Sequence, residues 1–153
     1  MRLTNAIPLK KAKYKNLNFE LTTHFDESLP KIEIVPQDIG RVLVNLVNNV
    51  FYAVNERSKN IVPTKEGRGL VTITTQKTNN TIEIRVKDNG TGMSDAVREK
   101  VFQPFFTTKP TGSGTGLGLS LAYDIITKGH GGRLTVESKE GEGSEFVITL
   151  PIK

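Results

Sequence analysis

Apolar residues follow two different periods along the chain, and the change of period separates predicted strands from predicted helices. Leu17, Phe19 and Leu21 alternate with polar residues, which is the period of a strand with one buried face. The alternation returns in Lys31–Val35 and stops at Pro36, so we predict a second short strand there. Two strands are therefore expected before the first helix.

The longest predicted helix runs from Pro36 to about Arg57. Proline suits a first helical turn, and Asp38 there is favourable beside the positive end of the helix dipole. The apolar positions recur at three- and four-residue intervals and form one broad stripe: Ile39, Val42, Leu43, Leu46, Val47, Val50, Ala53 and Val54. The polar, basic segment Ser58–Gly69 that follows is predicted to be a loop.

The second half of the chain predicts two hairpins and two helices. The elements are a hairpin of residues 71–86 that turns at Asn79 and Asn80, a short helix capped by Ser94 and reaching Phe102, a largely apolar helix over Leu117–Lys128 closed by Gly129, and the strands Arg133–Ser138 and Ser144–Leu150. We expect one layer of mixed strands covered by about three helices.

Composition narrows the class of protein. A length of 153 residues suits one domain. The absence of cysteine excludes disulfides, thiolate metal sites and cysteine nucleophiles, and it suits a reducing compartment. No run approaches the ~18 apolar residues of a membrane span, and the basic start leads into polar residues. We therefore expect neither a membrane segment nor a secretory signal, and a cytoplasmic location.

The net charge of +5 belongs to the N-terminal arm. Five basic residues precede the first acid, Glu20, and the 16 basic residues that remain balance the 16 acidic ones. A basic arm can bind phosphate backbones, but such arms are more often solvated linkers, and the chain lacks the aromatic, zinc-ligand and helix-turn-helix patterns of nucleic-acid readers. We assign residues 1–16 to an arm, place the domain at 17–153, and expect no nucleic-acid partner.

One face of the predicted long helix carries amides and a phenol, from Asn45, Asn48, Asn49 and Tyr52. These residues project together, opposite the apolar stripe. The face could be ordinary solvated surface, although asparagine is a weak choice in a helix interior. Because Asn45 and Asn49 lie one turn apart and amide oxygens suit hard cations, the face is also a candidate Mg²⁺ site that phosphates and water would complete.

A second candidate follows the predicted strand of residues 82–86. Alternation carries Asp88 onto the apolar face of that strand, where a carboxylate needs hydrogen-bond donors. The sequence Asp-Asn-Gly-Thr-Gly at 88–92 is also a common turn formula. A nucleobase amino group would be one suitable donor, and Gly90 and Gly92 would let a flat ring approach the backbone.

Residues 112–119 alternate glycine with other residues and lead directly into a predicted helix. Such a segment can present backbone N–H groups to an anion, although a plain flexible loop would have the same composition. It lacks the Gly-Lys-Ser/Thr of a P-loop, and the chain has no His-Arg-Asp or Asp-Phe-Gly triplet of the common protein kinases. Just before it, Phe102, Phe105 and Phe106 with Lys109 form either a hinged lid or part of the core.

In this order and spacing the motifs resemble one family, the bacterial sensor histidine kinases. Residues 45–49 resemble its N box, 88–92 its G1 box, 102–106 its F box and 114–119 its G2 box, while 130–132 and 141–151 match its closing strands. The resemblance covers residues 17–153. It implies an α/β fold, the Bergerat two-layer sandwich, in which about three helices cover a mixed, mainly antiparallel sheet; gyrase, mismatch-repair and chaperone ATPases share this fold.

The resemblance also implies a site for ATP or ADP with Mg²⁺. Asp88 would accept the adenine amino group, Ser144 would stand where the family usually has threonine, and Asn49 would bind the metal. Asn45, Asn49 and Lys109 form the implied catalytic set. The implied nucleotide-binding residues are Asn45, Asn49, Tyr52, Asp88, Gly90, Gly92, Met93, Phe102, Thr107, Thr108, Lys109, Gly114, Thr115, Gly116, Leu117, Gly118, Leu119 and Ser144. Tyr52 departs from the family pattern, which often has a basic residue there.

Asn45 bears on the type of reaction. In hydrolytic relatives a glutamate at this position activates water, and an amide cannot act as that base, so we expect transfer of phosphate to an incoming histidine. The family's acceptor histidine lies on a helix of a preceding dimerisation domain, a context that neither His24 nor His130 has.

We therefore expect a histidine kinase catalytic domain that does not phosphorylate itself and is a monomer when alone. Its expected partners are a His-containing dimerisation domain and, indirectly, a response regulator, with no direct membrane contact. The alternatives are an ATPase or a serine-directed anti-sigma-type kinase of the same fold, and a non-catalytic nucleotide-sensing module.

Overall fold

The computed structural model describes residues 19–60, 69–107 and 117–152. Its strands are β1 (Phe19–His24), β2 (Gly69–Thr78), β3 (Thr81–Asp88), β4 (Arg133–Lys139) and β5 (Gly143–Pro151). Its helices are α2 (Pro36–Asn60), α3 (Asp95–Lys100) and α4 (Gly118–Asp124), the last of which continues as a π-helical segment, Ile125–Gly129. No helix within these ranges is long and apolar enough to cross a membrane.

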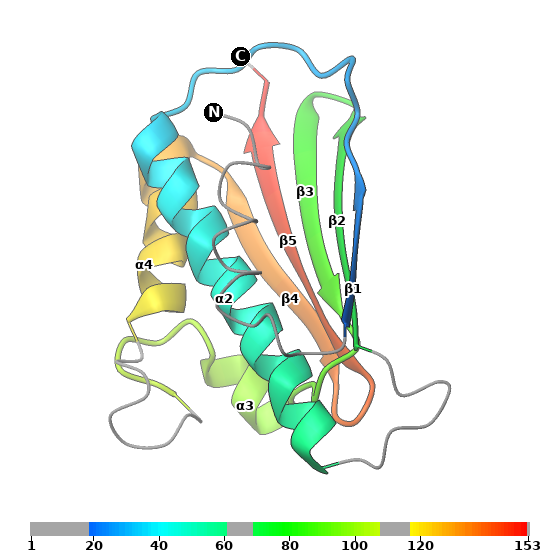
Figure 1. The fold of residues 1–153 in the computed structure, drawn as a ribbon. Coiled ribbons are helices and arrows are strands. Elements are labelled where there is room, and N and C mark those ends of the chain that lie inside the picture. The colour runs from blue at the N-terminus through cyan, green and yellow to red at the C-terminus, as the bar shows by residue number, and fades with distance from the viewer. Residues whose placement is uncertain (1–18, 61–68, 108–116, 153) are drawn as a thin grey trace.

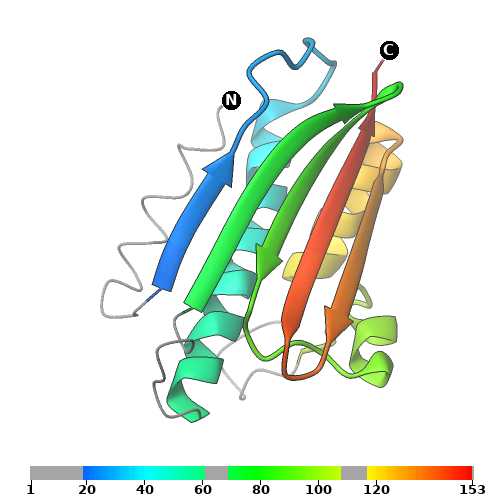
Figure 2. The same ribbon diagram turned by 90° about the vertical axis from the view of Figure 1, so that its right-hand side faces the viewer.

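The strands form one sheet in the order β1-β2-β3-β5-β4. β1 runs parallel to β2, and the other neighbours are antiparallel. The helices of the described ranges lie on one side of the sheet, and none of them covers its other side, as the two views show (Figures 1 and 2). The expected α/β fold, a two-layer sandwich with a mixed, mainly antiparallel sheet, is confirmed.

The core lies between α2 and the covered face of the sheet. Seven of the eight apolar positions predicted for the helix stripe are buried, and they are Ile39, Val42, Leu43, Leu46, Val47, Val50 and Val54. The eighth, Ala53, is partly exposed and faces a cavity instead. Phe51 is fully buried although it falls outside the predicted stripe. The sheet contributes alternate residues of its strands, including Val71, Ile73, Ile84, Val86, Phe146 and Ile148.

The predicted strand at Lys31–Val35 is wrong, because these residues are irregular and pair with no strand. Their alternation is nevertheless real, since Ile32 and Ile34 pack against the core. The backbone of Val35 is held in another way. Its N–H donates to Nε2 of His130 at 3.0 Å, and its carbonyl accepts the N–H groups of the first turn of α2.

The other predicted elements are present with shifted ends. Ser94 caps α3 by accepting the N–H of Val97 at 3.3 Å, but that helix ends at Lys100 rather than Phe102. The helix predicted at 117–128 is the pair formed by α4 and the π-helical segment. It is less enclosed than its apolar composition indicated, because Leu121 and Tyr123 are 40% and 39% exposed.

Candidate functional site

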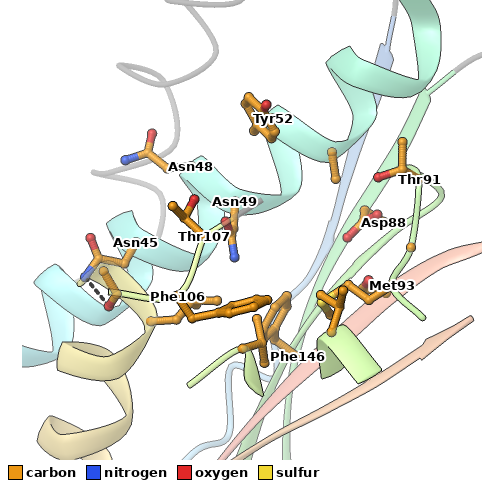
Figure 3. Close-up of a pocket in the computed structure, with 17 residues that line it drawn as sticks. Asn45, Asn48, Asn49, Tyr52, Asp88, Thr91, Met93, Phe106, Thr107 and Phe146 are labelled. Carbon is orange, nitrogen blue, oxygen red and sulfur yellow. Dashed lines mark hydrogen bonds between the residues drawn. The ribbon is translucent and has the colours of Figure 1, made fainter. Parts of the chain in front are cut away.

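A cavity of about 400 Å³ lies between α2, α3 and the ends of β3 and β5 (Figure 3). Its walls come from one face of α2, the turn after β3, α3, residues 106 and 107, the start of α4, and β5. The lining residues are Asn45, Asn48, Asn49, Tyr52, Ala53, Asp88, Thr91, Gly92, Met93, Val97, Val101, Phe106, Thr107, Gly118, Leu119, Ser144 and Phe146.

One wall is the amide face of α2. Asn45, Asn49 and Tyr52 project from successive turns of the helix, as their sequence spacing predicted. The Nδ2 atom of Asn45 donates to the carbonyl of Gly118 at 3.0 Å and so ties α2 to the beginning of α4. This bond fixes the orientation of the Asn45 amide, since the donor nitrogen faces Gly118.

The opposite wall carries the carboxylate of Asp88, which reaches into the cavity from the end of β3 (Figure 3). Asp88 is only 4% exposed. Burial raises its pKa from the ordinary 3.8 to about 6, while hydrogen bonds from the backbone N–H groups of Gly90 and Ser144 oppose the rise. The Gly90 N–H lies 2.8 Å from Oδ1. The prediction that Asp88 is a buried carboxylate in need of donors is confirmed.

The turn after β3 is packed so closely that its glycines are required. A Cβ on Gly90 would lie 2.6 Å from the carbonyl carbon of Ala53 in α2. Gly92 has φ +67° and lies so close to the carbonyl oxygen of Lys139 that a Cβ would overlap it. The two glycines therefore hold the turn against α2 on one side and against the β4–β5 hairpin on the other.

Apolar side chains form a further wall of the cavity. Val97 and Val101, one turn apart around α3, line the cavity together with Phe106 and Phe146. Phe102 lies behind them, with its ring centroid 5.3 Å from that of Tyr123 and 6.4 Å from that of Phe146. Phe102 thus supports the wall rather than lining it.

The arrangement fits a flat, partly apolar group that donates a hydrogen bond at one end and carries acidic groups at the other. Asp88 is the single charged side chain in the described lining, and the apolar wall beside it would cover an aromatic ring. At the amide end, the described residues contain no cluster of acids and histidines that could hold a metal by itself. An amide oxygen such as that of Asn49 can ligate a hard cation such as Mg²⁺ whose other ligands come from a bound molecule and water.

Most of the described site residues predicted from the sequence meet in this cavity. Those in its lining are Asn45, Asn49, Tyr52, Asp88, Gly92, Met93, Thr107, Gly118, Leu119 and Ser144. Gly90, Phe102 and Leu117 are described but do not line it. Thr108, Lys109, Gly114, Thr115 and Gly116 lie outside the described residues.

Seven lining residues were not among the predicted site residues: Asn48, Ala53, Thr91, Val97, Val101, Phe106 and Phe146. Some of them had a signal in the sequence. Asn48 lies on the same helix face as Asn45, and its Oδ1 is buried without a hydrogen-bond partner in the described part of the chain. Val97 and Val101 have helical spacing, and Phe146 shares a strand face with Ser144.

Comparison with known proteins agrees with the geometry. The family described as "Histidine kinase-, DNA gyrase B-, and HSP90-like ATPase" matches residues 34–153. Sensor histidine kinase ZraS of Escherichia coli is 33% identical over 127 residues, which are 83% of this chain and 24% of that protein. Sensor protein FixL of Bradyrhizobium diazoefficiens is 40% identical over 113 residues, which are 74% of this chain and 20% of that protein. The chain thus spans a quarter or less of these relatives.

Solved structures give the same assignment. The catalytic domain of histidine kinase ThkA superimposes with a TM-score of 0.78 at 29% identity, covering 97% of this chain and 90% of that one. ThkA in complex with the response regulator TrrA gives a TM-score of 0.75 at 26% identity, covering 99% of this chain and 39% of that one. With the N-box amides and the buried Asp88 in one cavity, the chain belongs to the histidine kinase-, DNA gyrase B- and HSP90-like ATPase family.

Proposed function

We propose that the chain binds Mg-ATP and donates the γ-phosphate to a histidine on a separate dimerisation domain, as the catalytic part of a two-component sensor histidine kinase. The observation that carries this proposal is the buried carboxylate of Asp88, which faces an apolar-walled cavity whose far side is an array of amides. The similarity to ZraS and FixL, both named as sensors, favours the kinase branch of the family.

Each wall of the cavity has a part in holding the nucleotide. Asp88 accepts a hydrogen bond from the adenine amino group, while Met93 and Phe146 cover the ring. Asn49 binds Mg²⁺ through its amide oxygen, and the metal, when bound, neutralises phosphate charge. Phosphoryl transfer depends mainly on such positioning and electrostatic stabilisation, so the protein needs no covalent chemistry of its own.

Asn45 favours transfer over hydrolysis. Its amide has no proton-accepting group of useful basicity, and its Nδ2 is engaged with the carbonyl of Gly118. A water in the cavity therefore meets no general base at this position, and ATP persists until an acceptor arrives.

We infer that the acceptor histidine belongs to another domain. His24 closes strand β1 rather than lying on a helix. His130 uses both ring nitrogens, because Nε2 accepts the N–H of Val35 at 3.0 Å and Nδ1 lies 2.9 Å from the carbonyl of Ile125. Neither is placed to attack a phosphate in the cavity. The ThkA complex with TrrA makes a response regulator the natural downstream partner.

We further propose that the 153-residue chain alone is monomeric and acts in the cytoplasm, where ATP is available. Residues 1–16 would join it to the dimerisation domain; they lie outside the described residues. The role of Lys109 at the phosphates, also outside those residues, stays part of the proposal.

The proposal is tested by incubating the chain with radiolabelled Mg-ATP and a dimerisation domain of a related sensor kinase supplied in trans. We expect labelled phosphate on the histidine of that domain and none on the chain itself. Label on a serine of the acceptor, or steady release of inorganic phosphate, would assign the chain to another branch of the family. Nucleotide binding without transfer to any of several acceptor domains would indicate a non-catalytic sensing module.

A further inference from the structure

A row of polar residues crosses three neighbouring strands at the Asp88 end of the cavity, where the proposed function places the adenine base. Ser144 of β5 lies in register with Asp88 of β3 on one side and with Ser138 of β4 on the other. Asp88 and Ser144 are buried and line the cavity, whereas Ser138 lies behind them and does not reach it. Of this row, the proposed function uses the Asp88 carboxylate and gives no role to Ser138.

The hydroxyl of Ser138 has three partners. Its Oγ accepts the N–H of Met93 at 2.8 Å, donates to the carbonyl of Gly143 at 3.1 Å, and lies 2.8 Å from the Oγ of Ser144. A serine hydroxyl has one proton and two lone pairs. The Gly143 carbonyl can only accept and the Met93 N–H can only donate, so all three contacts are hydrogen bonds in one assignment alone: Ser138 donates to Gly143 and accepts from Met93 and Ser144.

The direction of the bond between the two serines follows from this count. The Ser144 hydroxyl therefore donates its one hydrogen bond to Ser138 and turns its lone pairs toward the cavity. The Asp88 side chain beside it is a carboxylate, which is also an acceptor. At this end of the cavity the Asp88 carboxylate and the Ser144 hydroxyl therefore both present acceptors, and this pair suits a base that has an exocyclic amino group.

We propose that Ser138 is a positioning residue that sets base specificity, by holding the Ser144 hydroxyl as an acceptor toward the bound nucleotide. The inference rests on the proposed function, because it concerns the same nucleotide. Without Ser138 the proton of Ser144 has no fixed acceptor, so the hydroxyl can rotate and donate into the cavity. The difference in affinity between ATP and a nucleotide whose base lacks the amino group then becomes smaller.

The test compares the dissociation constants of Mg-ATP and of the Mg complex of purine riboside triphosphate, which has hydrogen in place of the 6-amino group and the same ring atoms. Isothermal titration calorimetry at pH 8 gives both constants for the wild-type chain and for Ser138→Ala. We expect the wild type to prefer ATP, and Ser138→Ala to lower that preference about fivefold, the change that corresponds to one neutral hydrogen bond.

Three variants separate this role from a merely structural one. Ser138→Thr keeps the hydroxyl and should restore the preference of the wild type. Ser144→Ala removes the group through which Ser138 acts, so adding Ser138→Ala to it should leave the preference unchanged. If Ser138→Ala weakens both nucleotides by the same factor, or still changes the preference in the Ser144→Ala background, the inference is overturned.

The wild-type chain also distinguishes failure of the inference from failure of the proposed function. Tight binding of both nucleotides without a preference would leave nucleotide binding intact and refute the acceptor pair formed by Asp88 and Ser144. Binding of neither nucleotide would refute the proposed function and the inference with it.

Discussion

Asp88 carries a charge that the fold tolerates at a cost. The side chain is 4% exposed, and burial raises its pKa from 3.8 to about 6, so the native state resists ionisation of this group. The difference between the two values corresponds to about 3 kcal/mol. Replacing Asp88 by asparagine removes the charge, and the one amide oxygen that remains cannot serve both the backbone N–H groups and the adenine amino group, as two carboxylate oxygens can. The variant should therefore gain stability and lose nucleotide binding.

The gain should depend on pH in a defined direction. Because the folded-state pKa lies above that of the unfolded chain, ionised Asp88 destabilises the protein fully above about pH 6, and the effect fades as the pH falls toward 3.8. At pH 8 Asp88→Asn should stabilise the chain by up to about 3 kcal/mol. This gain is reduced by the free energy of the hydrogen bond that the Ser144 N–H makes with the carboxylate and loses with the amide. A gain of this size raises the melting temperature by several degrees, since about 2–4 °C per kcal/mol is typical for this length. At pH 4.5 most of the gain should be gone.

Thermal unfolding of both proteins at pH 8 and pH 4.5, with and without Mg-ATP, measures these effects. For the wild type at pH 8, ligand at about 100 times its Kd should add about 2.7 kcal/mol, and Asp88→Asn should show no such shift. Glu137→Gln, on an exposed residue of β4, is the matched control and should follow the wild type. A variant that is less stable at pH 8, or equally stabilised at both pH values, would refute the argument from burial. A normal nucleotide shift would refute the role of Asp88.

Three further substitutions test the fold and the site. Phe51→Ala empties a fully buried position and should cost about 3–5 kcal/mol in urea unfolding; a loss below 1 kcal/mol would contradict the packing. His130→Gln can still accept the N–H of Val35 whereas His130→Asn is too short, so Asn should be the less stable by about 1 kcal/mol, and equal stabilities would argue against that bond. Steady phosphate release from ATP should stay at background in the wild type and in Asn45→Ala, and a wild-type rate that this variant abolishes would contradict the absence of a base at this position.

The fold could be predicted from the sequence wherever period and burial coincide. α2 buries seven of the eight stripe residues, and β2 and β3 bury alternate residues as expected. The failure at Lys31–Val35 has a physical reason. Alternation reports that every second residue faces the core, and Ile32 and Ile34 are partly buried against it without pairing with a strand. Pairing depends on what lies beside a segment, which a local pattern does not contain.

The site was predictable where one motif fixed one side chain. Asn45, Asn49 and Asp88 line the cavity because helix and strand periods already set their directions. The apolar wall was not predictable in the same way. Phe106 lines the cavity, whereas Phe102 stacks on Tyr123. The segment that holds both is irregular, so no helix or strand period indicates which of the two side chains faces the cavity. The sequence did not single out Ser138, because its hydrogen bond with the N–H of Met93 joins two residues that are far apart in sequence.

The parallel pairing of β1 with β2 has a consequence for how the protein folds. Phe19 and Gly69 are partners although 50 residues separate them, and α2 lies in between, whereas β2–β3 and β4–β5 are hairpins between consecutive strands. Local pairings form fast and long-range ones form slowly, so the hairpins should precede the docking of α2 and β1. Asp88 lies in β3, which pairs in the early step of folding, and Asn49 lies in α2, which docks in the late step. A nucleotide that requires both ends of the cavity therefore binds only to the completed fold, and its binding rate during refolding measures the last step of assembly.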